Sequence, residues 1–156
     1  MIRYDPRALG RYLLFALPLT VLLIALFNLV LELLGLAPDL GPLVGWHAAA
    51  WGLPGAYVLG TWALEALALT ALYLLIDARG GWSVVNGLAA GWIAWVFRGP
   101  LLVLTASGAS GQHAAWWTLA WRWLILYTLA GLLLALAARA GGLRRPGVTP
   151  VDRRGE

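Results

Sequence analysis

Long apolar stretches, separated by short polar or glycine-rich segments, run through most of the chain. Four of them reach the length of about 20 residues that a helix needs to cross a bilayer. Each stretch is apolar along its whole length and shows no strict alternation, which favours helices over strands. The four predicted spans cover about residues 12–34, 53–76, 83–105 and 114–138. The expected fold class is therefore all-α: a polytopic membrane protein with a four-helix transmembrane domain over residues 1–139.

The composition supports the bilayer as the solvent for this fold. Hydrophobic residues make up 62% of the 156 residues and charged residues only 12%, and the mean hydropathy is +0.80. A soluble domain carries about 25% charged residues, so too few polar groups are present to cover a soluble surface of this size. Cysteine is absent, which excludes disulfides, thiol catalysis and thiolate metal sites.

The basic residues, all of them arginines, gather on one side of the predicted spans. Three precede the first span, one lies between the second and third, and five follow the fourth, whereas loops 35–52 and 106–113 contain none. The positive-inside rule predicts that both termini are cytoplasmic and that the protein is a multi-pass protein of the cell (cytoplasmic) membrane. We interpret these arginines as topology signals and do not expect nucleic acid as a partner.

Two segments outside the spans carry their own predictions. Residues about 43–51 are too apolar for a free linker, and tryptophans lie near both ends of this segment. We expect a short helix lying in the membrane interface, with a shallow re-entrant segment as the alternative. Residues 140–156 combine proline, glycine and charge with little to bury, which predicts a disordered cytoplasmic tail.

An arginine, Arg98, interrupts the apolar run WVFRGPLLVLT in the third predicted span. At about 100° per residue, Gly87 and Gly91 lie within roughly 20° of Arg98 around the helix. Together with Ser83 they form a face of small residues, a GxxxG pattern that lets another helix approach closely. Unless this spacing arises by chance, Arg98 faces protein rather than lipid. The following Gly99–Pro100 step predicts a break, because proline has no amide to donate.

Four ionisable side chains are predicted in the outer half of the membrane, and their formal charges cancel. They are Glu32, Glu65, Arg98 and Arg122. A lone charge at the centre of a span costs about 2.5–3.5 kcal/mol on insertion scales. Glu65 is too short and too deep to reach the headgroups, so we expect it to be protonated or paired with an arginine. Such a cluster is compatible with structural glue, with a functional polar pocket open to the outside, or with a surface for a partner subunit.

Other candidate chemistry is sparse. The sequence contains no HExxH, P-loop or dinucleotide motif, and no catalytic residue is assigned. His47 and His113, both predicted at the outer surface, are the weak candidates for haem ligation. Neither has a companion at ligand spacing, so we expect no metal and no cofactor. A quinone pocket near Arg98 and Arg122 is an alternative without a motif.

These observations lead to three hypotheses about function. The first is a non-enzymatic accessory or scaffold subunit that packs with itself, as a homo-oligomer, or with another membrane protein. It depends on the small-residue face and on the absence of a catalytic motif. The alternative is a small transporter or channel for a proton, an anion or a lipid headgroup, using the Glu/Arg cluster. The third is a haem- or quinone-binding membrane subunit.

Overall fold

A computed structural model describes residues 4–34, 54–101, 103–104 and 113–143. Every regular element in these ranges is a helix, which confirms the prediction of an all-helical chain. The four helices are α1 (Pro6–Leu33), α3 (Pro54–Asp77), α4 (Ser83–Arg98) and α6 (His113–Ala140). The predicted interfacial helix at 43–51 lies outside the described residues, and so does most of the predicted tail.

Three of the described helices are long and apolar enough to cross a membrane, over Pro6–Leu31, Leu59–Asp77 and Trp117–Ala140. The fourth, α4, has 16 residues, fewer than the about 20 that a span needs. It ends at Arg98 because Gly99 leaves the helical region, with ψ at −91°. Helical residues resume at Pro100. The predicted span 83–105 is thus divided at the Gly99–Pro100 step, where the sequence predicts a break.

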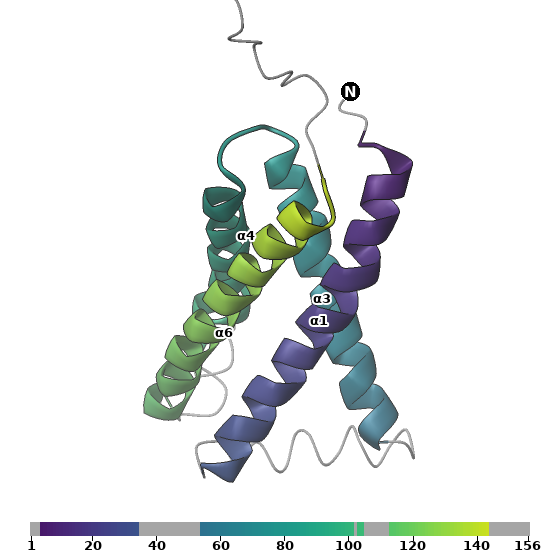
Figure 1. Ribbon diagram of the computed structural model, residues 1–156. Coiled ribbons are helices and arrows are strands. Elements are labelled where there is room, and N and C mark those ends of the chain that lie inside the picture. Colours follow the sequence, from purple (N-terminus) through teal and green to yellow (C-terminus); the bar gives the residue numbers. More distant parts are fainter. Residues whose placement is uncertain (1–3, 35–53, 102, 105–112, 144–156) are drawn as a thin grey trace, which may run out of the picture.

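The helices run alternately in opposite directions (Figure 1). The start of α1, the turn between α3 and α4 and the end of α6 all lie at one end of the bundle. α4 and α6 pack together most extensively, α1 contacts both α3 and α6, and α3 has little contact with α6. As a result α6 is the most buried of the three long helices.

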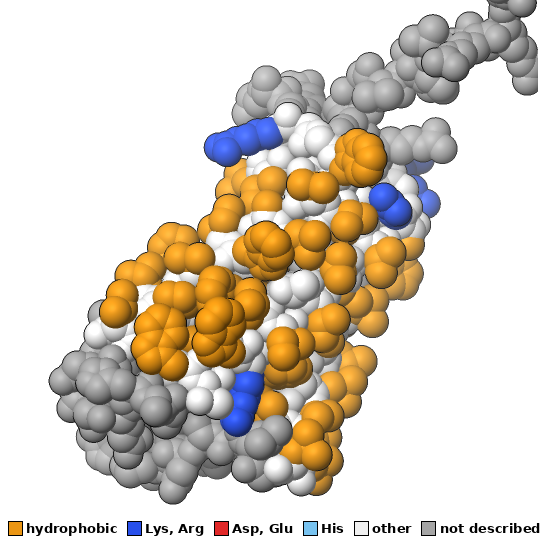
Figure 2. Space-filling model, turned by 90° about the vertical axis from the view of Figure 1, so that its left-hand side faces the viewer, with side chains coloured by type: hydrophobic (Ala, Val, Ile, Leu, Met, Phe, Trp, Pro, Cys, Tyr) orange, Lys and Arg blue, Asp and Glu red, His pale blue; other side chains and the backbone are white. Residues whose placement is uncertain are grey.

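The core between the helices is mainly apolar, and so is the outer surface. Tyr12, Tyr73 and Leu134 are fully buried. Hydrophobic side chains also cover the middle of the face in Figure 2, with arginines only near its two ends. Trp92 and Trp121, for example, are more than half exposed. An apolar outer surface of this extent is typical of a lipid-facing or partner-facing protein.

α4 and α6 meet backbone to backbone. A Cβ atom added at Gly87 would overlap the carbonyl oxygen of Gly131, and one added at Gly131 would overlap that of Gly87. Gly91, one turn further, likewise has no room for a side chain. Ser83, at the start of this face, accepts a hydrogen bond of 3.1 Å from Nε of Arg139 on α6. The small-residue face predicted on the third span therefore packs against α6 of the same chain.

Candidate functional site

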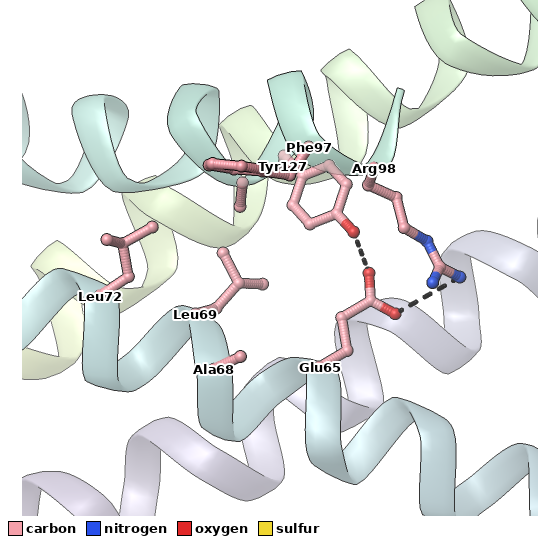
Figure 3. Close-up of a pocket in the computed structure, with 8 residues that line it drawn as sticks. Glu65, Ala68, Leu69, Leu72, Phe97, Arg98 and Tyr127 are labelled. Atoms are coloured by element: carbon pink, nitrogen blue, oxygen red, sulfur yellow. Dashed lines mark hydrogen bonds and ion pairs between the residues drawn. The ribbon is translucent and has the colours of Figure 1, made fainter. Parts of the chain in front are cut away.

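Glu65 on α3 is held by side chains from two other helices (Figure 3). Its Oε1 accepts a hydrogen bond from the hydroxyl of Tyr127 on α6. Its Oε2 lies 3.8 Å from Nη2 of Arg98 at the end of α4. The Glu65 side chain is only 14% exposed, so these two contacts replace most of the hydration that the carboxylate loses in the bundle.

Arg98 is the exposed member of this ion pair. Its side chain is 47% exposed, and its Cζ lies 5.2 Å from the ring centroid of Trp123 on α6. The indole covers one face of the guanidinium, in the geometry of a cation–π contact. At 3.8 Å the contact with Glu65 is an ion pair and too long for a hydrogen bond. Among the described contacts, the guanidinium therefore retains N–H donors for a further acceptor.

A cavity of about 350 Å³ lies beside this pair, between α3 and α4. Glu65, Arg98 and Tyr127 form its polar end. The remaining wall consists of Ala68, Leu69, Leu72, Ala94 and Phe97. The volume falls at the lower end of the range of about 300–1,000 Å³ that small-molecule sites occupy, and a mostly apolar wall with a few polar groups is typical of them.

The antiparallel hairpin of α3 and α4 determines which residues meet. A tight turn joins the helices, where Gly80 and Gly81 have φ of 97° and 103°, a conformation that glycine adopts without strain. Next to this turn, Nδ2 of Asn86 donates a hydrogen bond of 2.9 Å to Oδ1 of Asp77. Glu65 lies twelve residues before Asp77 on α3, and Arg98 lies twelve residues after Asn86 on α4, so the same register pairs them. At the rise of a helix, this second pair is about 18 Å from the first.

The structure brings together part of the predicted cluster. Glu65 and Arg98 form the pair described above, whereas Arg122 is half-buried on α6 and does not line the cavity. The side chain of Glu32 lies outside the described part of the chain. The same is true of His47 and of the side chain of His113, the first residue of α6.

Sequence reasoning did not find Tyr127, Trp123 or the Asp77–Asn86 bond. Tyr127 lies one turn before Gly131, so both lie on one side of the helix, and this spacing is a signal that could have found it. Asp77 and Asn86 lie on either side of the shortest connection between two predicted spans, which places them near one another. Their polarity next to apolar helices was a usable signal as well.

The arrangement offers an anion-binding guanidinium, an acidic counter-charge and an adjacent apolar cavity. Among the described residues, no group of three His, Asp or Glu side chains lies together in a way that could hold a metal ion. The described site thus combines one cationic and one anionic side chain beside an apolar cavity. No family model, no curated protein and no solved structure matches the chain.

Proposed function

We propose that the protein is a small four-span transporter of the cell membrane whose working site comprises Glu65, Arg98, Tyr127 and the cavity beside them, called here the Glu65 site. It binds an anion or an anionic headgroup at Arg98 and carries it across the membrane without a catalytic step. The observation that carries this proposal is a carboxylate that is only 14% exposed and a half-exposed arginine in the wall of one cavity.

The topology in this proposal has support from the arrangement of the helices. α4 runs back between two helices that are long enough to span, and helical residues continue past Gly99. The described flanking arginines (Arg7, Arg11, Arg79 and Arg139) belong to the start of α1, the α3–α4 turn and the end of α6, which share one end of the bundle (Figure 1). The positive-inside rule assigns that end to the cytoplasm.

The ion pair suits a site that is alternately empty and occupied. With no ligand bound, Glu65 neutralises Arg98, which avoids the high free energy of an isolated charge in the membrane. An incoming anion competes with Glu65 for the exposed guanidinium. Tyr127 holds Glu65 in place while this exchange occurs. A pair that served only to join helices would gain from being closed, as the Asp77–Asn86 pair is, with 4% and 5% exposure.

Reconstitution into liposomes tests the proposal. Uptake of chloride and phosphate, proton movement and translocation of fluorescent anionic lipid are measured for the wild type, Glu65→Gln and Arg98→Gln. We expect at least one activity in the wild type and a loss of about tenfold or more in both variants, because a charged contact contributes about 1.5–3 kcal/mol. Arg79→Gln removes an exposed arginine of the α3–α4 turn and is the matched control. Flux that is absent in the wild type, or unchanged in Glu65→Gln, contradicts the proposal.

A non-enzymatic accessory subunit is the second candidate function. The packing of α4 limits which surface could bind a partner. The small-residue face of α4 is covered by α6, so association has to use another face. Exposed aromatic side chains of α4 and α6, including Trp92 and Trp121, offer such a surface. If this candidate holds, the purified protein runs as an oligomer or with another membrane protein, and Trp121→Leu reduces this association. An absorption spectrum of the same sample tests the haem hypothesis.

A further inference from the structure

We infer that the ligand of the Glu65 site is a single-chain amphiphile with a phosphate-type anionic headgroup, which enters sideways from the bilayer. The headgroup binds Arg98, and the hydrocarbon chain lies along Leu69 and Leu72. This inference rests on the proposed function and names the ligand class for it.

The cavity changes in polarity along its length. Its charged and hydroxyl groups lie at the end formed by Glu65, Arg98 and Tyr127, and every other lining residue is apolar. From Glu65 to Leu72 the cavity follows two turns of α3, or about 10 Å. A hydrated inorganic ion would lose hydration against such a wall with no polar group in return, whereas a hydrocarbon chain has no hydration to lose there. The wall therefore favours a ligand with a tail.

The opening of the cavity faces the outer surface of the helices. Ala68 on α3 and Phe97 on α4 line the cavity and are themselves exposed, Phe97 to 68%. Their exposed neighbours on α3 include Leu64 and Leu67. Because these exposed neighbours are apolar, this surface faces acyl chains in the proposed membrane protein. A lipid-like molecule reaches the cavity without passing through water.

The volume limits the number of chains. About 350 Å³ accommodates one hydrocarbon chain beside the polar end, and a two-chain lipid would have to leave its second chain in the bilayer. Two of the lining residues, Ala68 on α3 and Ala94 on α4, have small side chains. A single chain is the occupant that fills the cavity without displacing either helix.

The charge arrangement selects an anionic headgroup. Arg98 is 47% exposed and Glu65 is 14% exposed, so an arriving headgroup meets the guanidinium first. Trp123 covers one face of the Arg98 guanidinium, so a headgroup approaches the N–H groups at the edge of the guanidinium. Arginine binds phosphate oxygens through two parallel N–H groups. A quaternary ammonium headgroup would instead be repelled by Arg98.

Binding of defined probes to the purified full-length protein in dodecyl maltoside tests the inference. Isothermal titration compares dodecyl phosphate, inorganic phosphate and dodecyl trimethylammonium; the detergent has the same chain with a neutral headgroup. We expect dodecyl phosphate to bind at least about tenfold more tightly than inorganic phosphate, because the apolar wall accommodates its chain and offers inorganic phosphate no further polar contact. No binding of dodecyl trimethylammonium is expected at this site.

Two variants test separately how the headgroup and the hydrocarbon chain contribute to binding. Arg98→Gln is expected to weaken dodecyl phosphate binding roughly 10- to 100-fold, as loss of a charged hydrogen-bonding partner does. Ala68→Phe fills the opening, so it weakens dodecyl phosphate and leaves inorganic phosphate unchanged. Ala71→Phe, at an exposed position of α3 outside the cavity wall, is the matched control. If Arg98→Gln does not fold, the pair of alanine variants still decides the result.

The outcomes distinguish the ligand class from the function. Equal affinity for dodecyl phosphate and inorganic phosphate overturns the inference, since it shows that the site binds a free anion. Tighter binding of the cationic probe, or equal effects of Ala68→Phe and Ala71→Phe, overturns it as well. None of these results contradicts transport at Glu65, which fails on separate grounds if flux in liposomes does not depend on that residue.

Discussion

The two halves of α4 pack in opposite ways, although they belong to one helix with the same two neighbours. In the closed half, from Asn86 to Gly91, the backbone touches α6 and the buried positions carry only small or neutral side chains. In the open half, from Ala94 to Arg98, α4 carries an indole and a guanidinium, and a cavity lies between it and α3. There Nε1 of Trp95 donates a hydrogen bond of 2.7 Å to the carbonyl oxygen of Ala120. One half of α4 is thus fixed by backbone contact with α6, whereas the other half lines the cavity toward α3.

Each half also contains one polar pair between α3 and α4, and the comparison shows what distinguishes a site from a structural contact. Asp77 and Asn86 are both buried and are joined by a hydrogen bond. Glu65 and Arg98 occupy the same register of the hairpin, but they line a cavity and the arginine is half-exposed. A polar pair in a membrane helix is therefore not by itself evidence of function. Access to it is the informative property.

The largest expected effect comes from the closed half. Gly87→Leu places a side chain where the backbone of Gly131 lies, so it should lower the free energy of unfolding by about 3 kcal/mol, at the upper end of overpacking. Thermal unfolding in detergent measures this effect. Gly60→Leu is the control, because a Cβ added there meets nothing within 4 Å. Equal stability of the two variants would show that the backbone contact is absent.

The closed polar pair should be the next most sensitive feature. Asp77→Leu leaves the buried amide of Asn86 without this partner, and we expect a loss of about 1–3 kcal/mol in unfolding free energy. The double variant Asp77→Leu, Asn86→Leu should recover much of that loss, because replacing both members removes the unmet hydrogen bond. A double-mutant cycle by chemical denaturation measures the recovery. Simple additivity of the two substitutions would contradict a direct coupling.

A smaller effect is expected at the boundary between the halves. Trp95→Phe retains an aromatic ring but removes the N–H that bonds to Ala120, which should lower the unfolding free energy by about 1 kcal/mol. The shift in thermal midpoint reports it. Trp82→Phe, at an exposed indole that is 81% accessible, should change the midpoint little. A larger effect at Trp82 than at Trp95 would contradict this assignment.

The smallest effect on stability should come from the open pair. Glu65→Gln retains an oxygen that accepts the Tyr127 hydrogen bond, and Arg98 is exposed enough to extend toward the headgroups. We expect a change in unfolding free energy within about 0.5 kcal/mol, because the half-exposed Arg98 stays solvated when Glu65 loses its charge, together with the loss of flux predicted above. A stability loss as large as that of Asp77→Leu would indicate that the open pair is structural.

Much of the helical organisation could be predicted from local sequence. The apolar runs predict where α1, α3 and α6 lie. The predicted ends agree with the observed ones to within two residues, except at the start of α1, which begins six residues earlier than predicted. Gly99–Pro100 predicts the end of α4, because proline cannot continue the hydrogen bonding of a helix. The glycine spacing predicts a face of close contact that also contains Arg98. The depth of Glu65 predicts that it needs a partner.

The identity of the partners was decided by the tertiary structure alone. Helical periodicity determines which way a side chain points around its own axis, but not which neighbouring helix it meets. That choice depends on crossing angle and register, and these are set by packing over the whole bundle. The glycine face could have met a second copy, and it meets Gly131 of α6. Tyr127 and Trp123 complete the Glu65 site because backbone contact at Gly87 and Gly91 brings α6 alongside α4.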